Sequence, residues 1–195
     1  MAFKNIDSDR SGASSFVSGK IYRYLAHDHA RIDAALQRST SSPGTIEPAA
    51  YAEFRAGLLR HIGMEEKILL PAARVARGGE PLPIASKLRL DHGALTALLV
   101  PTPTPAIVAA IRAILEHHNP LEENPGGVYE QCERLAGAEA DEIVRRMKAA
   151  PAVKMLPHVD NAFVMDAARR ALKRAGYDLA LRASGLSFWC GRLSM

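Results

Sequence analysis

The feature that most constrains this chain is a repeated order of ionisable residues inside apolar helical patterns. The segments YLAHDHARIDAAL and KLRLDHGALTALL each contain Asp-His. Each is followed by a segment containing His-x-x-x-Glu-Glu, first FRAGLLRHIGMEE and then IRAILEHHNPLEE. Because every segment also spaces its apolar residues by three or four, the repeat predicts two helical hairpins with matching polar positions.

The apolar spacing predicts helices that are joined by short polar or proline-rich loops. Helices are expected over residues 20–37, 48–77, 84–100, 105–123, 129–149 and 161–175. Thr104 is expected to cap the fourth of them and Gly176 to close the last. No segment has the alternating pattern of a strand. The chain is therefore predicted to be all-α, with its first four helices in an antiparallel up-down four-helix bundle followed by a C-terminal helical extension.

The expected domain organisation is a flexible leader over residues 1–17, a metal-binding bundle over 18–149 and a basic helical extension over 150–195. The net charge of +4 is uneven, because the chain from Val144 onwards has ten Lys and Arg against three Asp and Glu. No aromatic residues are interleaved with this charge as in nucleic-acid-binding motifs, so a solvated surface is favoured over a nucleic-acid partner. A protein partner that contacts the basic segment stays an alternative.

The composition argues against a membrane protein and against a disulfide framework. The longest apolar stretch, residues 94–114, is interrupted by prolines and cannot span a bilayer. The N-terminal segment lacks the apolar region of a secretory signal. Cys132 and Cys190 are far apart in sequence and fit reduced thiols. The sequence therefore predicts a cytoplasmic protein with no membrane partner.

Six of the repeated ionisable residues fall at core-facing positions of the predicted helices. Residues four apart on a helix differ by about 40° around its axis, so each His-x-x-x-Glu pair points in one direction. The six residues that continue the apolar stripes are His29, His61, Glu65, His92, His118 and Glu122. A buried carboxylate without a partner costs several kcal/mol, so a bound cation is predicted to compensate these charges.

Four imidazoles and two carboxylates form a ligand set for metal ions. The mixture of nitrogen and oxygen donors suits iron, manganese or zinc, and the absence of cysteine argues against a structural zinc site. The two glutamates can bridge two metals, each of which also takes two histidines. Such a centre leaves coordination positions open for O2, peroxide, NO or water.

The residues beside these positions have simpler interpretations. Three histidines are predicted to lie at the surface, namely His27, His117 and His158. Glu66 and Glu123 lie off the apolar stripes, and they are either solvated or orient a ligand. Pro120 cannot donate a hydrogen bond to the carbonyl of Glu116, so the fourth helix is predicted to bend or loosen there at a cost of about 3 kcal/mol.

In this order of motifs the sequence resembles the hemerythrin-like family, also called the HHE cation-binding domain, over residues 20–132. The resemblance implies an up-down four-helix bundle that holds an oxo- or hydroxo-bridged di-iron centre. It implies bridging by Glu65 and Glu122, with terminal ligation by His29, His61, His92 and His118. Functions in the family include reversible oxygen binding, sensing of oxygen, redox state or iron, and repair or nitric-oxide chemistry at iron centres.

The sequence departs from the family pattern in two places. Oxygen carriers of the family place a second histidine one turn after the third-helix histidine, where this chain has Thr96. This difference argues against simple oxygen carriage. The fourth helix runs into Asn-Pro-Gly-Gly at 124–127, where family members continue as helix, and the resemblance does not extend beyond Ala149.

These features leave three functions to compare. The favoured one is a non-haem di-iron protein that binds or senses a small oxidant, namely O2, NO or peroxide. The second is a di-iron enzyme or an iron-centre repair protein that processes NO or peroxide, although the Glu-x-x-His pattern of ferritin and oxidase sites is absent. The third is a regulatory or interaction module in which the metal is structural and the basic segment DAARRALKRAG contacts a partner.

Overall fold

The structure is a computed structural model in which residues 19–178 are described. Within this range the chain forms helices and turns and no β-strand, so the all-α prediction is confirmed there. The elements are α1 (Lys20–Ser39), α2 (Pro48–Met64), the π-helical turn η1 (Glu65–Leu69), α3 (Leu70–Ala76), α4 (Ala85–Leu98), α5 (Pro105–Glu123), α6 (Val128–Ala136), the 3-10 turn η2 (Gly137–Glu139), α7 (Ala140–Lys148) and α8 (Ala162–Ala175). The expected leader over residues 1–17 lies outside the described residues.

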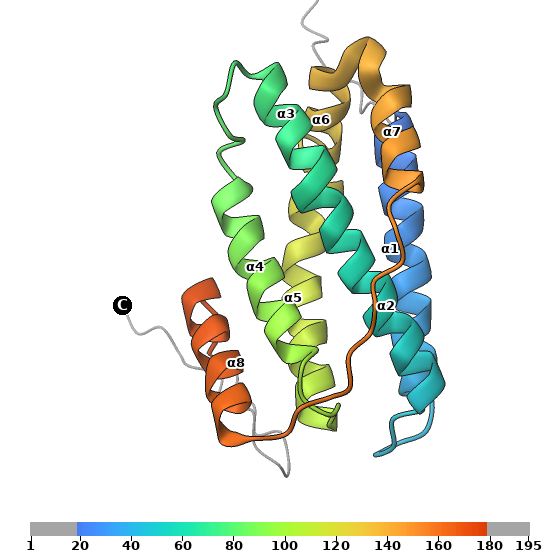
Figure 1. Ribbon diagram of the computed structural model, residues 1–195, viewed down its shortest axis with the longest axis vertical. Helices are drawn as coiled ribbons and strands as arrows, with labels where there is room; N and C mark the ends of the chain where they lie inside the picture. Colours follow the sequence, from blue (N-terminus) through green and yellow to red (C-terminus); the bar gives the residue numbers. More distant parts are fainter. Residues whose placement is uncertain (1–18, 179–195) are drawn as a thin grey trace, which may run out of the picture.

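The long helices lie side by side, roughly along the longest dimension of the molecule (Figure 1). α1 packs against α2, and α4 packs against α5. α2, η1 and α3 follow one another without a loop, so the prediction of one helical segment over residues 48–77 is confirmed. The predicted helices over 20–37, 84–100 and 105–123 also agree with the observed elements to within a few residues.

The local sequence explains where two of the long helices begin. Before α2, the carboxylate of Glu47 accepts hydrogen bonds from the amides of Ala49 at 3.0 Å and Ala50 at 2.6 Å. Before α5, the hydroxyl of Thr104 accepts a hydrogen bond from the amide of Ile107 at 3.2 Å, as the sequence predicts. Both helices have proline in their first turn, where a missing N–H costs nothing because it would have no partner inside the helix.

Two clusters of buried apolar side chains lie on either side of a polar layer. The first cluster includes Leu36, Phe54, Leu58, Leu95 and Ile111. The second cluster includes Leu25, Met64, Leu88, Val128 and Met147. α1 and α4 begin in the second cluster and end in the first. α2 and α5 begin in the first cluster and end beside the second. The predicted ligand positions fall between the clusters on each of these helices, so burial of the apolar residues holds the polar ones in the interior.

The π-helical turn η1 between α2 and α3 was not predicted from the sequence. In it the amide of Leu70 donates a hydrogen bond to the carbonyl of Glu65, five residues earlier. Pro71 follows directly and has no N–H, so the carbonyl of Lys67 lacks its usual donor four residues later. π-Helical turns are frequent at functional sites. This one begins at Glu65, which is a predicted metal ligand.

Beyond α5 the chain forms shorter helices. The predicted helix over residues 129–149 is not continuous, because Gly137 has a positive φ of 50° and α6 gives way there to η2 and then α7. The last predicted helix is confirmed as α8, which is capped by the side chain of Asn161 and closed by Gly176 at a φ of 87°. α8 packs along α4, and its Leu172 belongs to the first cluster.

None of the helices in the described part of the chain combines the length and the apolarity needed to cross a membrane. Cys132 is a free thiol in the second cluster, and burial raises its pKa to about 12. Cys190 lies outside the described residues. The expectation of reduced thiols in a cytoplasm therefore stays a prediction.

Candidate metal centre

The six predicted ligand residues meet in the interior of the molecule. His29 is 8 % exposed, and the other five are 3 % exposed or less. They form two groups that share both glutamates, and within each group one ligand atom of every residue lies within 4.8 Å of the others. The first group is His29, His61, Glu65 and Glu122, and the second group is Glu65, His92, His118 and Glu122.

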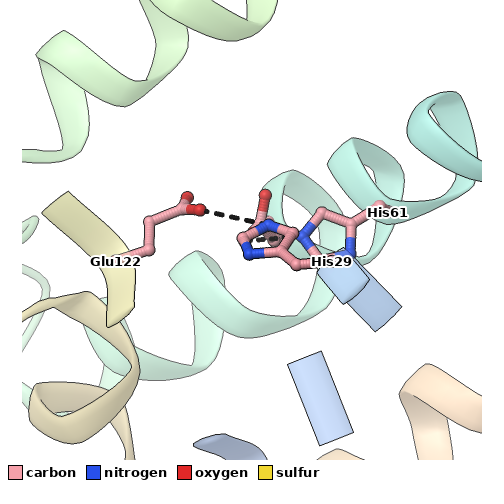
Figure 2. A group of neighbouring side chains, drawn as sticks. His29, His61 and Glu122 are labelled. Carbon is pink, nitrogen blue, oxygen red and sulfur yellow. Dashed lines mark ion pairs between the residues drawn. The ribbon is translucent and has the colours of Figure 1, made fainter. Parts of the chain in front are cut away.

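The first group shows how two helices bring their histidines together. The rings of His29 on α1 and His61 on α2 lie next to each other with centroids 4.3 Å apart. Figure 2 shows these rings, with the carboxylate of Glu122 approaching from α5. The arrangement places nitrogen and oxygen donors from three different helices around one point.

Each glutamate directs one oxygen to each group. The two oxygens of Glu65 lie 3.3 Å from Nε2 of His61 and 3.2 Å from Nε2 of His92. Glu122 contacts both groups in the same way. One of its oxygens lies 3.5 Å from Nε2 of His29, and the other lies 3.2 Å from Nε2 of His118. A carboxylate held in this way can bind two cations at once, one at each oxygen.

Two carboxylate oxygens in this centre are buried without a hydrogen bond of normal geometry. They are Oε2 of Glu65 and Oε1 of Glu122, and both face the second group. Leaving a buried acceptor unsatisfied costs about 1–3 kcal/mol, and more when the group is charged. The arrangement is therefore better suited to holding cations than to a network of hydrogen bonds alone.

The aspartate of each Asp-His motif orients the histidine of the next long helix along the chain. Asp28 on α1 accepts a hydrogen bond from Nδ1 of His61 on α2 at 2.9 Å. Asp91 on α4 accepts one from Nδ1 of His118 on α5 at 3.4 Å. The role of these two aspartates could not be predicted from the sequence, because it depends on how neighbouring helices pack.

The second glutamate of each His-x-x-x-Glu-Glu motif has the same role for the other two histidines. Glu66 accepts a hydrogen bond from Nδ1 of His92 at 2.8 Å, and Glu123 accepts one from Nδ1 of His29. Of the two interpretations left open for these glutamates, orientation of a ligand is therefore supported over solvation. Each of these four carboxylates thus joins its own helix to a histidine on a neighbouring one, so that α1, α2–η1, α4 and α5 are linked in a ring. With each Nδ1 bound in this way, each Nε2 is directed to the interior.

The histidines and carboxylates of this centre shift one another's pKa values. Burial by itself would lower the pKa values of the histidines, but the carboxylates around them have the larger combined effect. The pKa is raised to about 10 for His61 and His118 and to about 9 for His92. Burial would also raise the pKa of Glu65, but His61 and His92 hold it well below its usual value. These pKa shifts favour protonated histidines beside an ionised Glu65 when no cation is bound.

The metal-free protein is expected to lose stability as the pH rises from about 7 to about 10. A histidine with a raised folded-state pKa contributes stability below its unfolded value of 6.5 and loses it as the pH passes through about 9 for His92 and about 10 for His61 and His118. Thermal unfolding with a chelator present should show a melting temperature several degrees lower at pH 10 than at pH 7. Metal-loaded protein, whose ligating nitrogens carry no protons, should change less. An equal fall in both samples would contradict this account.

Tyr129, near the start of α6, is a further residue of the centre that the sequence pattern does not predict. Its side chain is fully buried, and the two acceptors within reach of its single hydroxyl proton are Oε1 of Glu65 at 2.7 Å and Oε2 of Glu122 at 3.1 Å. The hydroxyl oxygen lies 3.2 Å from Nε2 of both His29 and His61. Burial, followed by the two carboxylates, raises the pKa of the phenol well above its usual value. No helical periodicity connects Tyr129 to the other residues, because a helix break separates it from α5.

The residues expected to lie at the surface do so with one exception. His27 and His117 are exposed. His158 is half-buried, and its Nδ1 lies 3.3 Å from the carbonyl oxygen of Val100, so the prediction of a plain surface position is wrong for this residue. Thr96 is exposed as well, so its side chain does not take the place of the absent histidine.

Pro120 does not interrupt α5. The helix continues from Pro105 to Glu123 with Pro120 inside it, and both Pro120 and Glu116 are exposed. Because this part of the helix faces outward, water can bond to the carbonyl that proline leaves without a donor. The break comes instead at Asn124, where the chain turns into α6.

No protein-family model, no curated protein and no solved structure matches this chain. The centre consists of two buried groups of histidine and glutamate that can hold metal ions.

Proposed function

We propose that this chain is a non-haem di-iron protein that binds or senses a small oxidant, namely O2, NO or peroxide, in an up-down four-helix bundle of the hemerythrin-like kind. The observation that carries the proposal is the pair of buried groups that share both carboxylates. A site for one metal would need only one such group. A purely structural network would be expected to give the two buried carboxylate oxygens, Oε2 of Glu65 and Oε1 of Glu122, hydrogen bonds of normal geometry, which they lack. The alternation of the long helices between the two apolar clusters supports the bundle.

In this proposal each iron takes two imidazoles and shares the two carboxylates. The ligands are His29 and His61 for one ion, His92 and His118 for the other, and Glu65 and Glu122 for both. When bound, iron supplies the redox chemistry and the Lewis acidity that small oxidants require. The chain supplies buried carboxylates, fixed imidazole rings and an apolar surrounding. The donor set without thiolate suits iron, with manganese or zinc as substitutes.

A second candidate function, a regulatory or interaction module, is supported by a series of hydrogen bonds from α8 to the second group. Lys87 on α4 donates to Oδ1 of Asp91 at 2.7 Å and to the carbonyl of Ala175, at the end of α8, at 2.9 Å. Asp91 in turn orients His118 in the second group. A protein partner that displaced the basic helix α8 would therefore disturb a metal ligand. These hydrogen bonds connect α8 to the candidate metal centre.

Iron analysis of the purified protein tests the proposed function. Protein that is supplied with ferrous iron without oxygen and then oxidised is expected to hold two irons per chain. It should absorb in the near-ultraviolet and visible, and reduction should bleach these bands. Zinc-loaded protein, which has no such bands, is the control for effects of metal binding on folding. Saturation at one iron per chain, or no binding at all, would contradict the proposal.

A further inference from the structure

The hydroxyl oxygen of Tyr129 lies close to every donor atom of the first group. It lies 2.7 Å from Oε1 of Glu65 and 3.1 Å from Oε2 of Glu122. It also lies 3.2 Å from Nε2 of both His29 and His61. Neighbouring donor atoms on a six-coordinate ion with bonds of about 2.1 Å lie about 3.0 Å apart. The oxygen therefore stands where a fifth donor to the same ion would stand.

Among residues 19–178, which the structure describes, no hydroxyl oxygen lies in this way beside the histidines of the second group. In the described part of the chain, the ring nitrogens of His92 bond to Glu66 and approach His118, and those of His118 approach Asp91 and His92. The histidines of this group thus have carboxylates and imidazoles as partners, and among the described residues the phenol of Tyr129 approaches the histidines of the first group, His29 and His61. The two metal positions are therefore unequal in the number of donors that the chain offers them.

The turn between α5 and α6 holds Tyr129 in this place. A Cβ atom on Gly127 would lie 2.6 Å from the carbonyl oxygen of Glu122, so only glycine permits this close approach. The carboxylate of Glu130 accepts a hydrogen bond from the amide of Gly126 at 2.6 Å. The Asn-Pro-Gly-Gly break thus brings the side chain of Tyr129 back against the ligand at the end of α5.

The far end of α6 is fixed as well. The carboxylate of Glu133 accepts hydrogen bonds from the amides of Lys20 at 3.0 Å and Ile21 at 2.7 Å, at the start of α1. α6 is therefore attached to α1 at one end and to α5 at the other. Because both ends are held, the phenol is part of a preorganised site.

We propose that Tyr129 is a fifth protein ligand of the metal ion in the first group, and that the open position for the exogenous oxidant therefore lies on the ion in the second group. The inference rests on the proposed function, since it requires a metal in each group. On binding ferric iron, the phenol oxygen forms the bond to the metal and its proton is released to bulk water. Coordination of a small molecule is then left to the ion held by His92 and His118.

Resonance Raman spectroscopy of the ferric protein tests the ligation. A phenolate bound to ferric iron gives a visible charge-transfer band and enhanced vibrations of the tyrosine ring, and both are expected in the wild-type protein. Tyr129→Phe should lose both while it still binds two irons. Tyr51→Phe is the matched control, because Tyr51 is equally buried but lies in the first apolar cluster, and this variant should keep both.

The outcomes separate this inference from the proposed function. A wild-type chain that fails to bind two irons contradicts the proposed function. Two bound irons without phenolate vibrations in the wild-type spectrum overturn the ligation by tyrosine, and this result needs no variant to fold. Vibrations that persist in Tyr129→Phe overturn it too. Titration with azide tests the open position: one azide per chain is expected, and two would overturn a single open position.

Discussion

Glu122→Ala is expected to abolish the binding of both metal ions. Glu122 belongs to both groups and directs one oxygen to each, so its removal takes a donor from each ion at once. Because the loss of an outer partner alone costs about 10–100-fold in metal affinity, the loss of a shared ligand should weaken each site by more than about 100-fold. Zinc titration against a chromophoric chelator measures both affinities.

Matched variants on the same helix separate this effect from damage to α5. Glu116→Ala removes an exposed carboxylate and should leave two metals bound. His118→Ala should cost the ion of the second group, whereas His117→Ala, at an exposed position, should cost none. Equal losses from the His117 and His118 variants would undo the assignment of their faces. Retention of one tight site in Glu122→Ala would show that this carboxylate does not bridge.

Metal binding is expected to produce the largest change in thermal stability. Without metal the interior holds six ionisable ligand residues, and a ligand that binds only the folded protein stabilises it by mass action. At a free metal concentration about 1,000 times the Kd, two sites contribute about 8 kcal/mol, which corresponds to a rise of about 16–32 °C in Tm for a chain of this size. Thermal unfolding followed by circular dichroism, with zinc or with a chelator, measures the shift.

The same measurement on Glu122→Ala provides the control, because a variant without metal sites should melt at the same temperature in zinc and in chelator. A wild-type chain whose Tm rises by only a few degrees in saturating zinc would indicate binding at the surface. In that case the buried groups would be a structural network, and the proposed function would be wrong.

The helices could be predicted from the sequence because their signals are local. Apolar residues spaced by three or four define the buried face of α1 and α4, and Thr104 and Gly176 act as caps through neighbouring backbone groups. Two interruptions of the predicted helices were not predicted, although each of them has a cause in the local sequence. Gly137 separates α6 from α7, and Pro71 accompanies the π-helical turn.

The inward orientation of the six predicted ligand residues was also predictable, since each continues an apolar stripe. Their burial agrees with that prediction. The carboxylates that orient the histidines were only partly predictable. Glu66 and Glu123 could be considered as outer partners, but Asp28 and Asp91 could not be assigned to a histidine, because each serves a ring on a different helix.

Helical periodicity relates residues only a few positions apart. The sequence was therefore enough to predict the helices of the described part of the chain and the face of each long helix that carries histidine and glutamate. How these faces combine depends on the packing of the helices against one another. This packing directed the two oxygens of Glu65 to different groups, paired each Nδ1 with a carboxylate from another helix, and brought Tyr129 back to the first group across a helix break. These contacts join residues on separate helices, whose relative position depends on packing of the apolar clusters and not on any local pattern.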